Sequence, residues 1–329
     1  MTRRRIRGDG VKGRPVLVAT EYEDATADLV VAELNRRRVP VLRFDPGRDF
    51  PASAVLASRT GAAGWGGRLT VGERTADLAD VRALYHRRPS AYAPNAHDQT
   101  ADFIAKENRR GLGGVLAALS SCLYLSHPQA IARAEYKPAQ LAAAIREGFN
   151  VPTTLITNDP AEARAFAREH RTVYKPLHAG AYHVDGEPAG IWAAPVEAHD
   201  IDTAVNRCAH LFQVRVPKTS DVRAVVVGQE VFCCRITAPR GVVDWRAEYR
   251  NLRYEAVECP DGVRLPLLRF LAGFGLNFGA FDFAVSADDE WWFLECNPNG
   301  QWAWLEEASG LPITSAIADL LEIGERTSG

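Results

Sequence analysis

The chain has 329 residues, and its 39 Lys and Arg residues nearly balance its 41 Asp and Glu residues, which gives a net charge of −2 at pH 7. The length predicts two or three domains with sizeable buried cores. The balanced charge and the lack of long apolar runs argue against nucleic acid and against a membrane as partners. The six cysteines form no CxxC pair, which is typical of reduced thiols in a cytoplasmic protein.

The first part of the chain alternates strand-like and helix-like segments. Residues 1–14 form a basic stretch that we expect to be a disordered tail. The hydrophobic periodicity then predicts a strand, a helix and a strand, at 16–19, 24–37 and 39–44. Short antiparallel strands between 61 and 84 and a long helix over 100–119 follow. We therefore expect an N-terminal α/β domain over residues 15–126.

The middle of the chain, residues 127–210, is expected to form a smaller central domain. A helix is predicted over 135–147, and Asp159 with Pro160 gives the capping pattern that begins a second helix over 161–170. Strands are predicted at 153–156 and 172–174. The loop over 177–190 contains Gly180, Gly186 and Gly190, and we expect it to be mobile.

The last part, residues 211–329, is expected to form a third, β-rich domain. The pattern predicts strands within 211–237, a helix over 265–273, a strand pair over 278–296 and a closing helix over 308–323. The fold class is therefore α/β or α+β, with an N-terminal α/β domain followed by two further domains.

The strand pair over 278–296 carries the strongest chemical signal. Asp288 and Asp289 are suited to a two-residue hairpin turn. That turn would pair Ser286 with Trp291, Ala284 with Phe293, and Asp282 with Glu295. Side chains alternate along a strand, so a second, core-like face would carry the apolar residues Phe281, Phe283, Trp292 and Leu294.

Two facing carboxylates need a compensating charge. At about 4 to 5 Å and an effective dielectric constant near 20, Asp282 and Glu295 would repel each other by about 3 to 4 kcal/mol. Neutralising one of them should therefore hold or raise stability. Asn297 shares their face, and this all-oxygen set suits Mg²⁺. An exposed acidic face without an ion, or an acid pair that shares a proton, remains the alternative.

Two lysines stand where an ammonium group could meet phosphate oxygens. Lys175 ends a strand just before the glycine-containing loop. Lys137 lies in the first turn of the predicted helix, where its charge opposes the helix dipole and calls for an anion nearby. Ordinary solvated lysines remain the alternative reading for both.

The segment from Ser220 to Ile236 reads as two strands around Gly228-Gln229. Period two places Asp221 and Arg223 on one face, either as a structural ion pair or as part of a site. Arg235 lies within the second strand, where it needs an anionic partner if it is buried, or else extends to solvent as an edge residue.

Taken together, these segments resemble the ATP-grasp superfamily, and within it the peptide maturases that build graspetides, the microviridin-like peptides with ω-ester or ω-amide links. The resemblance covers nearly the whole chain. Its most specific motif is FLECNPNGQWAWLE over 293–306. The supporting motifs are AEYKPAQL around Lys137, VYKPL around Lys175, LFQVRVPKTSDVRAVVVG over 211–228 and VDWR over 243–246.

The resemblance implies an ATP-grasp fold with an N-terminal pre-ATP-grasp domain, and it assigns roles to individual residues. The residues implied to contact ATP are Lys137, Lys175, Gln213, Val214 and Val216. Those implied to hold two Mg²⁺ ions are Asp282, Glu295 and Asn297. Those implied to act on the substrate or in catalysis are Asp221, Arg223, Arg235 and Arg246.

The resemblance also implies a cytoplasmic, ATP-dependent ligase that acts on a precursor peptide with a leader and an acidic core containing Thr or Ser. An Asp or Glu carboxylate would take the γ-phosphoryl group of ATP, and a Ser or Thr hydroxyl or a Lys amine would then close a ring. The alternative is a glutathione-synthetase-like ligase that joins free amino acids or short peptides. A binding protein without catalysis is a third reading, and self-association is left open.

Overall fold

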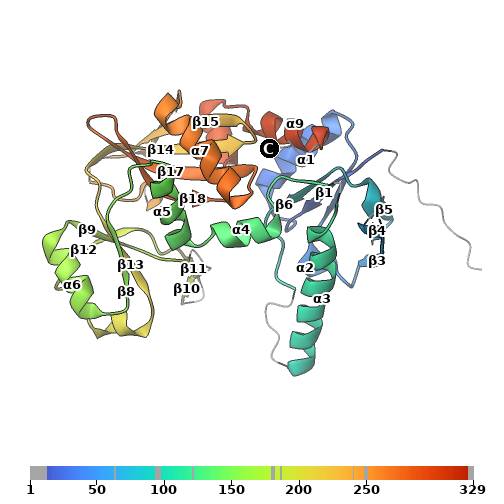
Figure 1. The fold of residues 1–329 in the computed structure, drawn as a ribbon, viewed down its shortest axis with the longest axis horizontal. Helices are drawn as coiled ribbons and strands as arrows, with labels where there is room; N and C mark the ends of the chain where they lie inside the picture. Colours follow the sequence, from blue (N-terminus) through green and yellow to red (C-terminus); the bar gives the residue numbers. More distant parts are fainter. Residues whose placement is uncertain are drawn as a thin grey trace, which may run out of the picture.

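The computed structural model describes residues 13–62, 64–92, 98–120, 122–178, 182–185, 187–239, 241–247 and 251–324. All but the last two residues of the expected basic tail, and Gly180 and Gly186 of the expected mobile loop, lie outside these ranges. Figure 1 shows a body of several sheets flanked by helices, with one long helix projecting from it. In the part of the chain that is described, no helix combines the length and apolar character needed to cross a membrane.

The N-terminal sheet is parallel, with strand order β2-β1-β6-β7. Its strands are β1 (Val16–Ala19), β2 (Val41–Phe44), β6 (Ala83–His86) and β7 (Leu123–Tyr124). The four residues of β1 are fully buried, as expected for a parallel strand covered on both faces. Asp24 caps the following helix α1 (Ala25–Arg36) by accepting a hydrogen bond from the Ala27 N–H. The predicted β-α-β start is confirmed.

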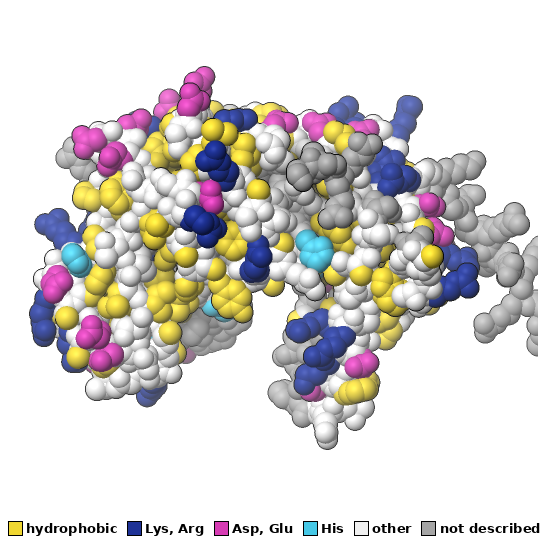
Figure 2. Space-filling view, viewed as in Figure 1, with side chains coloured by type: hydrophobic (Ala, Val, Ile, Leu, Met, Phe, Trp, Pro, Cys, Tyr) yellow, Lys and Arg dark blue, Asp and Glu magenta, His cyan; other side chains and the backbone are white. Residues whose placement is uncertain are grey.

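Smaller elements surround this sheet. An antiparallel three-stranded sheet contains β3 (Ala54–Gly61), β4 (Gly64–Val71) and β5 (Arg74–Asp77), near the short helices α2 (Pro46–Asp49) and η1 (Leu78–Asp80). The projecting helix is α3 (Gln99–Ala117), on which Figure 2 shows Lys and Arg side chains gathered. Helix α4 (Pro128–Ala134) then leads into α5 (Lys137–Arg146), so the helix predicted over 135–147 is preceded by a separate short one.

The central sheet is antiparallel, with strand order β12-β9-β13-β8. Its strands are β8 (Thr154–Thr157), β9 (Thr172–Lys175), β12 (Ala194–Val196) and β13 (His210–Val214). Helix α6 (Pro160–Glu169) begins at the predicted Asp159 cap and buries Ala163 and Ala167 against Phe212. The hairpin of β10 (Tyr182–Val184) and β11 (Glu187–Ala189) falls within the loop predicted over 177–190, and η2 (Thr203–Arg207) precedes β13.

The C-terminal sheet has five antiparallel strands in the order β16-β15-β14-β17-β18. They are β14 (Lys218–Val227), β15 (Glu230–Thr237), β16 (Arg253–Val257), β17 (Phe278–Ser286) and β18 (Trp291–Asn297). One apolar cluster joins one face of this sheet to α4, α5 and α7 (Asp261–Phe274). A second cluster joins the other face to α1, the N-terminal sheet, α8 (Ala303–Ser309) and α9 (Ile313–Ile323). Chain segments far apart in sequence therefore share one core.

The single closing helix predicted over 308–323 is wrong. Gly310 adopts a left-handed φ of 72° and ends α8, and α9 begins only after Pro312. The Glu306 carboxylate accepts hydrogen bonds from the Thr314 N–H at 2.7 Å and from its hydroxyl at 2.8 Å, which fixes the corner between the two helices. Glycine and proline together explain the break.

The β17–β18 hairpin differs from the prediction at its turn. The Ser286 N–H donates to the Glu290 carbonyl at 3.0 Å, and Asp289 has a φ of 58°, so the turn holds three residues instead of two. One residue, Leu294, is then extra in β18, because Asp282 pairs with Glu295 while Phe283 pairs with Phe293. The two one-residue shifts cancel. The predicted Asp282–Glu295 pair is therefore confirmed, and the other two predicted pairs are wrong.

The bulge also exchanges the faces of β18. Phe293, predicted on the carboxylate face, is fully buried in the apolar cluster under the sheet. Leu294, predicted in the core, is only partly buried and lines a cavity on the other face. Period two holds for an uninterrupted strand only, and one extra residue reverses the side chains beyond it.

Phe293→Ala should lower the free energy of unfolding by about 3 to 5 kcal/mol, because a fully buried ring leaves a cavity in the core. The matched control is Phe103→Ala on α3, where the ring is 62% exposed and the change should stay within about 0.5 kcal/mol. Urea unfolding of both variants measures the difference. Equal losses in the two variants would contradict this assignment of the core.

Candidate active site

A cavity of about 190 Å³ lies between the central sheet and the C-terminal sheet. It brings together most of the charged residues singled out from the sequence. Its polar lining includes Lys137, Lys175, Asp221, Asp244, Arg246, Asp282, Glu295 and Asn297. A larger hollow of about 1080 Å³ lies against β3 and β4, but its lining is mostly glycine and small residues, and it carries no comparable cluster of facing charges.

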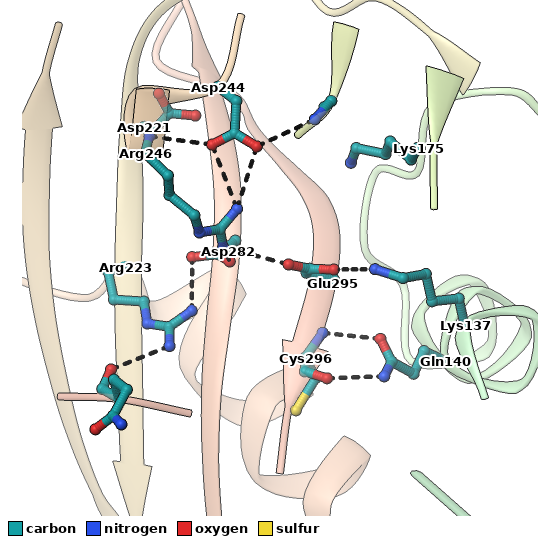
Figure 3. A network of polar contacts seen from close by, with 12 residues as sticks. Lys137, Gln140, Lys175, Asp221, Arg223, Asp244, Arg246, Asp282, Glu295 and Cys296 are labelled. Carbon is teal, nitrogen blue, oxygen red and sulfur yellow. Dashed lines mark hydrogen bonds and ion pairs between the residues drawn. The ribbon is translucent and has the colours of Figure 1, made fainter. Parts of the chain in front are cut away.

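The two facing carboxylates are held by three cations, as Figure 3 shows. Arg223 Nη1 donates to Asp282 Oδ1 at 2.8 Å, and Arg246 contacts the other Asp282 oxygen. Arg246 also reaches Glu295 Oε1 at 3.3 Å, and Lys137 contacts the second oxygen of Glu295. The compensating charge that the sequence called for is thus supplied in part by the protein itself.

These cations set the protonation of Glu295. Burial alone would raise the pKa of Glu295, but Lys137, Arg246 and Lys175 outweigh burial and bring its pKa well below the ordinary value. The pKa of Arg246 lies above its ordinary value despite burial, because Asp282, Glu295 and Asp244 surround it. Glu295 is therefore available as an anionic oxygen ligand at neutral pH, and each of the two carboxylates is paired with cations in the structure.

Helix α5 is fixed to the edge of β18 by one side chain. Gln140 Nε2 donates to the Cys296 carbonyl at 2.7 Å, and Gln140 Oε1 accepts from the Cys296 N–H at 2.9 Å. This double hydrogen bond satisfies the edge of the strand and places Lys137, one turn earlier in α5, beside Glu295. Sequence reasoning missed Gln140, whose only signal was a polar residue on the apolar face of a helix.

Lys175 lies at the end of β9 and points into the same cavity. Its Nζ donates to Gln213 Oε1 at 3.1 Å, and Gln213 Nε2 donates to Thr154 Oγ1 at 2.9 Å. Burial lowers the pKa of Lys175 to about 8, although the negative charge of Glu295 acts in the opposite direction. Gln213 is buried and holds the ammonium through its side chain.

A narrow, mostly apolar slot adjoins the charged cavity. It is lined by Val173, Lys175, Ala193, Gln213, Val214, Arg215, Val216, Lys218, Val243, Ala284 and Leu294. Lys175, Ala193, Val243 and Leu294 line both spaces, so the slot opens towards the charges. An apolar slot beside a cation-rich cavity has the chemistry that a planar base with attached phosphates needs.

Asp221 does not form the ion pair with Arg223 that was one of its two predicted alternatives, and Arg235 lies away from the cavity. Asp221 pairs with Lys218 at 2.6 Å and not with Arg223. Burial raises the pKa of Asp221 to about 6 against the opposing effect of Lys218. Arg235 pairs across the strands with Val222, whose side chain belongs to the cluster under the sheet, and its guanidinium binds Asp289 at 3.0 Å. Arg235 therefore lies on the opposite face from the carboxylates, and its catalytic assignment is wrong.

Other residues complete the cavity. Asp244 contacts Arg246 at 3.4 Å and accepts a hydrogen bond from the Ala193 N–H, while Lys218 also donates to the Val243 carbonyl at 2.7 Å. Sequence reasoning quoted the VDWR motif but did not select Asp244, and it did not select Lys218. Asn297 is exposed at the rim of the cavity, and its Oδ1 accepts from the Asn299 N–H at 3.0 Å.

The donor set fits a hard divalent cation. In the described ranges, no three His, Cys, Asp or Glu side chains are grouped as metal ligands. The available set is therefore two carboxylates, Asp282 and Glu295, with the amide of Asn297, and the remaining ligands would come from water and substrate. The Arg246 guanidinium already spans both carboxylates, which marks the space between them as a place that attracts positive charge.

Lys175→Met should make the protein more stable at pH 7, by about 1 to 3 kcal/mol, because the buried ammonium is penalised by burial. The folded-state pKa lies below the ordinary value, so this penalty is complete below pH 8 and fades as the pH rises towards 10.5. The advantage of the variant should shrink over the same window. Urea unfolding at several pH values measures this, with exposed Lys106→Met as the control. A constant difference across the window would contradict it.

Asp282→Asn should lower the free energy of unfolding by about 3 to 5 kcal/mol, since it leaves Arg223 buried without a charged partner. Glu295→Gln should lower it less, because Glu295 is more exposed and Lys137 can turn to solvent. The expectation that neutralising either carboxylate holds or raises stability is thus reversed for Asp282. Denaturant unfolding compares the two variants, and an equal or smaller loss in Asp282→Asn would refute this ranking.

Comparison with known proteins agrees with this geometry. The family model of the MvdD pre-ATP grasp domain matches residues 15–132. Macrocyclase MdnC of Microcystis aeruginosa, solved with precursor peptide MdnA, is 29% identical, with a TM-score of 0.82 over 94% of this chain and 99% of that one. A Chryseobacterium gregarium RiPP-associated ATP-grasp ligase, solved with ADP and a leader and core peptide, is 25% identical, with a TM-score of 0.81 over 94% and 96%.

Macrocyclase MdnB of Microcystis aeruginosa is also similar, at 27% identity and a TM-score of 0.78, over 94% of this chain and 99% of that one. No curated protein sequence matches the chain significantly. The matches span the N-terminal sheet, the central sheet and the C-terminal sheet together. The chain thus has the fold of these ATP-grasp ligases, and the similarity supports an ATP-dependent ligase of the graspetide-maturase kind that its motifs resemble.

Proposed function

We propose that this protein uses ATP to activate an Asp or Glu side chain of a precursor peptide and then closes an ω-ester or ω-amide ring with a Ser, Thr or Lys side chain of the same peptide. The observation that carries the proposal is the Asp282–Glu295 pair ringed by Lys137, Arg223 and Arg246 beside an apolar slot. The peptide complexes and the ADP complex of the similar enzymes support it.

ATP is proposed to lie across the slot and the charged cavity. The adenine would fill the apolar slot along Gln213, Val214 and Val216. The phosphates would then meet Lys175 and Lys137, which reach the cavity from the central sheet and from α5. Phosphate charge would stabilise the buried Lys175 ammonium and offset the effect of burial on its pKa.

Asp282, Glu295 and Asn297 are the residues that we propose to hold magnesium, with two ions expected from the family resemblance. Bound there, Mg²⁺ would neutralise charge on the transferring phosphoryl group. The contacts that Arg246 makes with both carboxylates would then be exchanged for contacts with the anionic substrate. We place Arg246 and Asp221 among the substrate contacts, because both line the cavity.

Arg223 is the residue that we propose to guide the acceptor carboxylate. A guanidinium can hold a carboxylate through two parallel hydrogen bonds, and this one already faces the metal ligands from β14. The carboxylate oxygen attacks the γ-phosphorus and ADP leaves. The hydroxyl or amine then attacks the acyl carbon, its proton is released, and phosphate leaves. The peptide loses one water for each ring.

The chain is also proposed to consist of three domains with separate roles. Residues 15–126 would form the pre-ATP-grasp domain, 127–210 the central subdomain with Lys137 and Lys175, and 211–329 the C-terminal subdomain with the carboxylates. The strongest support is that the phosphate-facing lysines and the carboxylates come from different sheets and helices that meet at one cavity. A bound nucleotide would therefore contact both subdomains.

The experiment incubates the protein with ATP, Mg²⁺ and candidate precursor peptides that are acidic and contain Thr. Mass spectrometry should show loss of one water for each ring, together with ADP release. Glu295→Gln should reduce ring closure by at least about 100-fold, because it removes a metal ligand. Exposed Lys106→Met serves as the matched control and should keep full activity.

Two further substrates distinguish a peptide maturase from a ligase that joins free amino acids. A peptide in which every Ser, Thr and Lys is replaced by Ala should release ADP without forming rings. Free amino acids should release no ADP. ADP release with amino acids, and none with any acidic peptide, would instead indicate the glutathione-synthetase-like reaction.

A further inference from the structure

The loop that follows β18, the strand that carries Glu295, is held by hydrogen bonds to the N-terminal sheet and α1. Gln301 Oε1 accepts hydrogen bonds from Arg87 Nη2 at 2.6 Å and from Thr26 Oγ1 at 2.5 Å. Asn299 Nδ2 donates to the Arg87 carbonyl at 2.9 Å, and Arg87 Nη1 donates to the Asn299 carbonyl at 3.3 Å. Thr26 lies in α1 and Arg87 follows β6, so the loop is anchored by elements far away in sequence.

The Arg87 anchor is rigid. Its Nε lies 2.7 Å from Asp24 Oδ2, and both side chains are about 1% exposed. Asp24 also caps α1 and accepts from the Thr20 hydroxyl at 2.8 Å, so its carboxylate cannot turn away. A buried ion pair with its remaining atoms hydrogen-bonded holds one geometry, because any other leaves a buried charge unpaired.

The same loop touches Arg223 directly. Arg223 Nη2 donates to the Gln301 carbonyl at 3.2 Å, while its Nη1 holds Asp282 at 2.8 Å. Gly300 packs so closely here that a Cβ atom would lie 2.5 Å from Arg223 Nη2 and 2.5 Å from the Ala280 Cβ. The loop therefore forms one wall of the space in which the guanidinium lies, and glycine is required at that wall.

We propose that Gln301, held by Thr26 and Arg87, is a positioning residue that sets the direction of the Arg223 guanidinium. The inference rests on the proposed function, in which Arg223 guides the acceptor carboxylate. A reacting group displaced by about 1 Å can lose on the order of 100-fold in rate. Gln301 is not among the residues that line the proposed nucleotide slot, so its hydrogen bonds should act on the rate of transfer and leave ATP affinity unchanged.

The test compares two substitutions of one side chain. Gln301→Met keeps the length but removes the acceptor of both hydrogen bonds, and Gln301→Glu keeps the acceptor. Gln301→Met should lower kcat for ring closure by about 10- to 100-fold, with KM for ATP and for the peptide within about twofold. Gln301→Glu should restore kcat to within about threefold. Thr26→Val, which removes one of the two donors, should fall between them.

A matched control separates positioning from stability. Asn277 Nδ2 donates to the Tyr124 carbonyl at 2.8 Å, which also links the C-terminal sheet to the N-terminal sheet but does not involve the loop. Asn277→Leu should lower the melting temperature and keep kcat when assayed well below it. Arg87 itself is not the test residue, since its removal leaves Asp24 buried and unpaired.

A double-mutant cycle asks whether Gln301 acts through Arg223. In an Arg223→Lys background, which keeps the charge but loses the planar fork, Gln301→Met should slow ring closure by less than about twofold more. Independent, multiplicative losses would overturn the inference, as would a Gln301→Met protein that melts earlier but keeps its kcat. Wild-type protein that closes no ring would instead overturn the proposed function, and the positioning role with it.

Discussion

The site depends on two carboxylates that are forced to face each other. Asp282 and Glu295 are directly paired across β17 and β18, so both side chains project from the same face of the sheet. Their repulsion is offset by Arg223, Arg246 and Lys137, each from a different element. In this structure the protein's own side chains supply the compensating positive charge, and a bound divalent cation would supply charge of the same sign at the same place.

That constraint explains the arrangement of the surrounding elements. Helix α5 is bonded through Gln140 to the edge of β18, which keeps Lys137 at Glu295. The central sheet brings Lys175 to the same cavity through Gln213. The C-terminal sheet packs on opposite faces against two separate apolar clusters, and the charged cavity lies between this sheet and the central sheet. The apolar slot also lies between the central sheet and the C-terminal sheet, so it adjoins the charged cavity.

The sequence predicted the Asp282–Glu295 pair because period two and a hairpin turn are local rules. The outcome was right, although the turn holds three residues and Leu294 bulges, since the two shifts cancel. Arg235 was misassigned because its face follows from the pairing of β14 with β15, which one strand's pattern does not give. Asp244 and Lys218 carried no periodic signal, and Gln140 was marked only as a polar residue on the apolar face of a helix. Their roles come from tertiary contacts, as do the hydrogen bonds that Thr26 and Arg87 donate to Gln301.

Metal binding by the facing carboxylates can be measured by titrating Mn²⁺, a paramagnetic substitute for Mg²⁺, into the protein with ADP and following electron paramagnetic resonance. Wild-type protein should bind Mn²⁺ tightly only when ADP is present, because the phosphates would complete the oxygen set of Asp282, Glu295 and Asn297. Glu295→Gln should weaken this binding by at least about tenfold. Unchanged Mn²⁺ affinity in Glu295→Gln would contradict the claim that the facing carboxylates hold the metal.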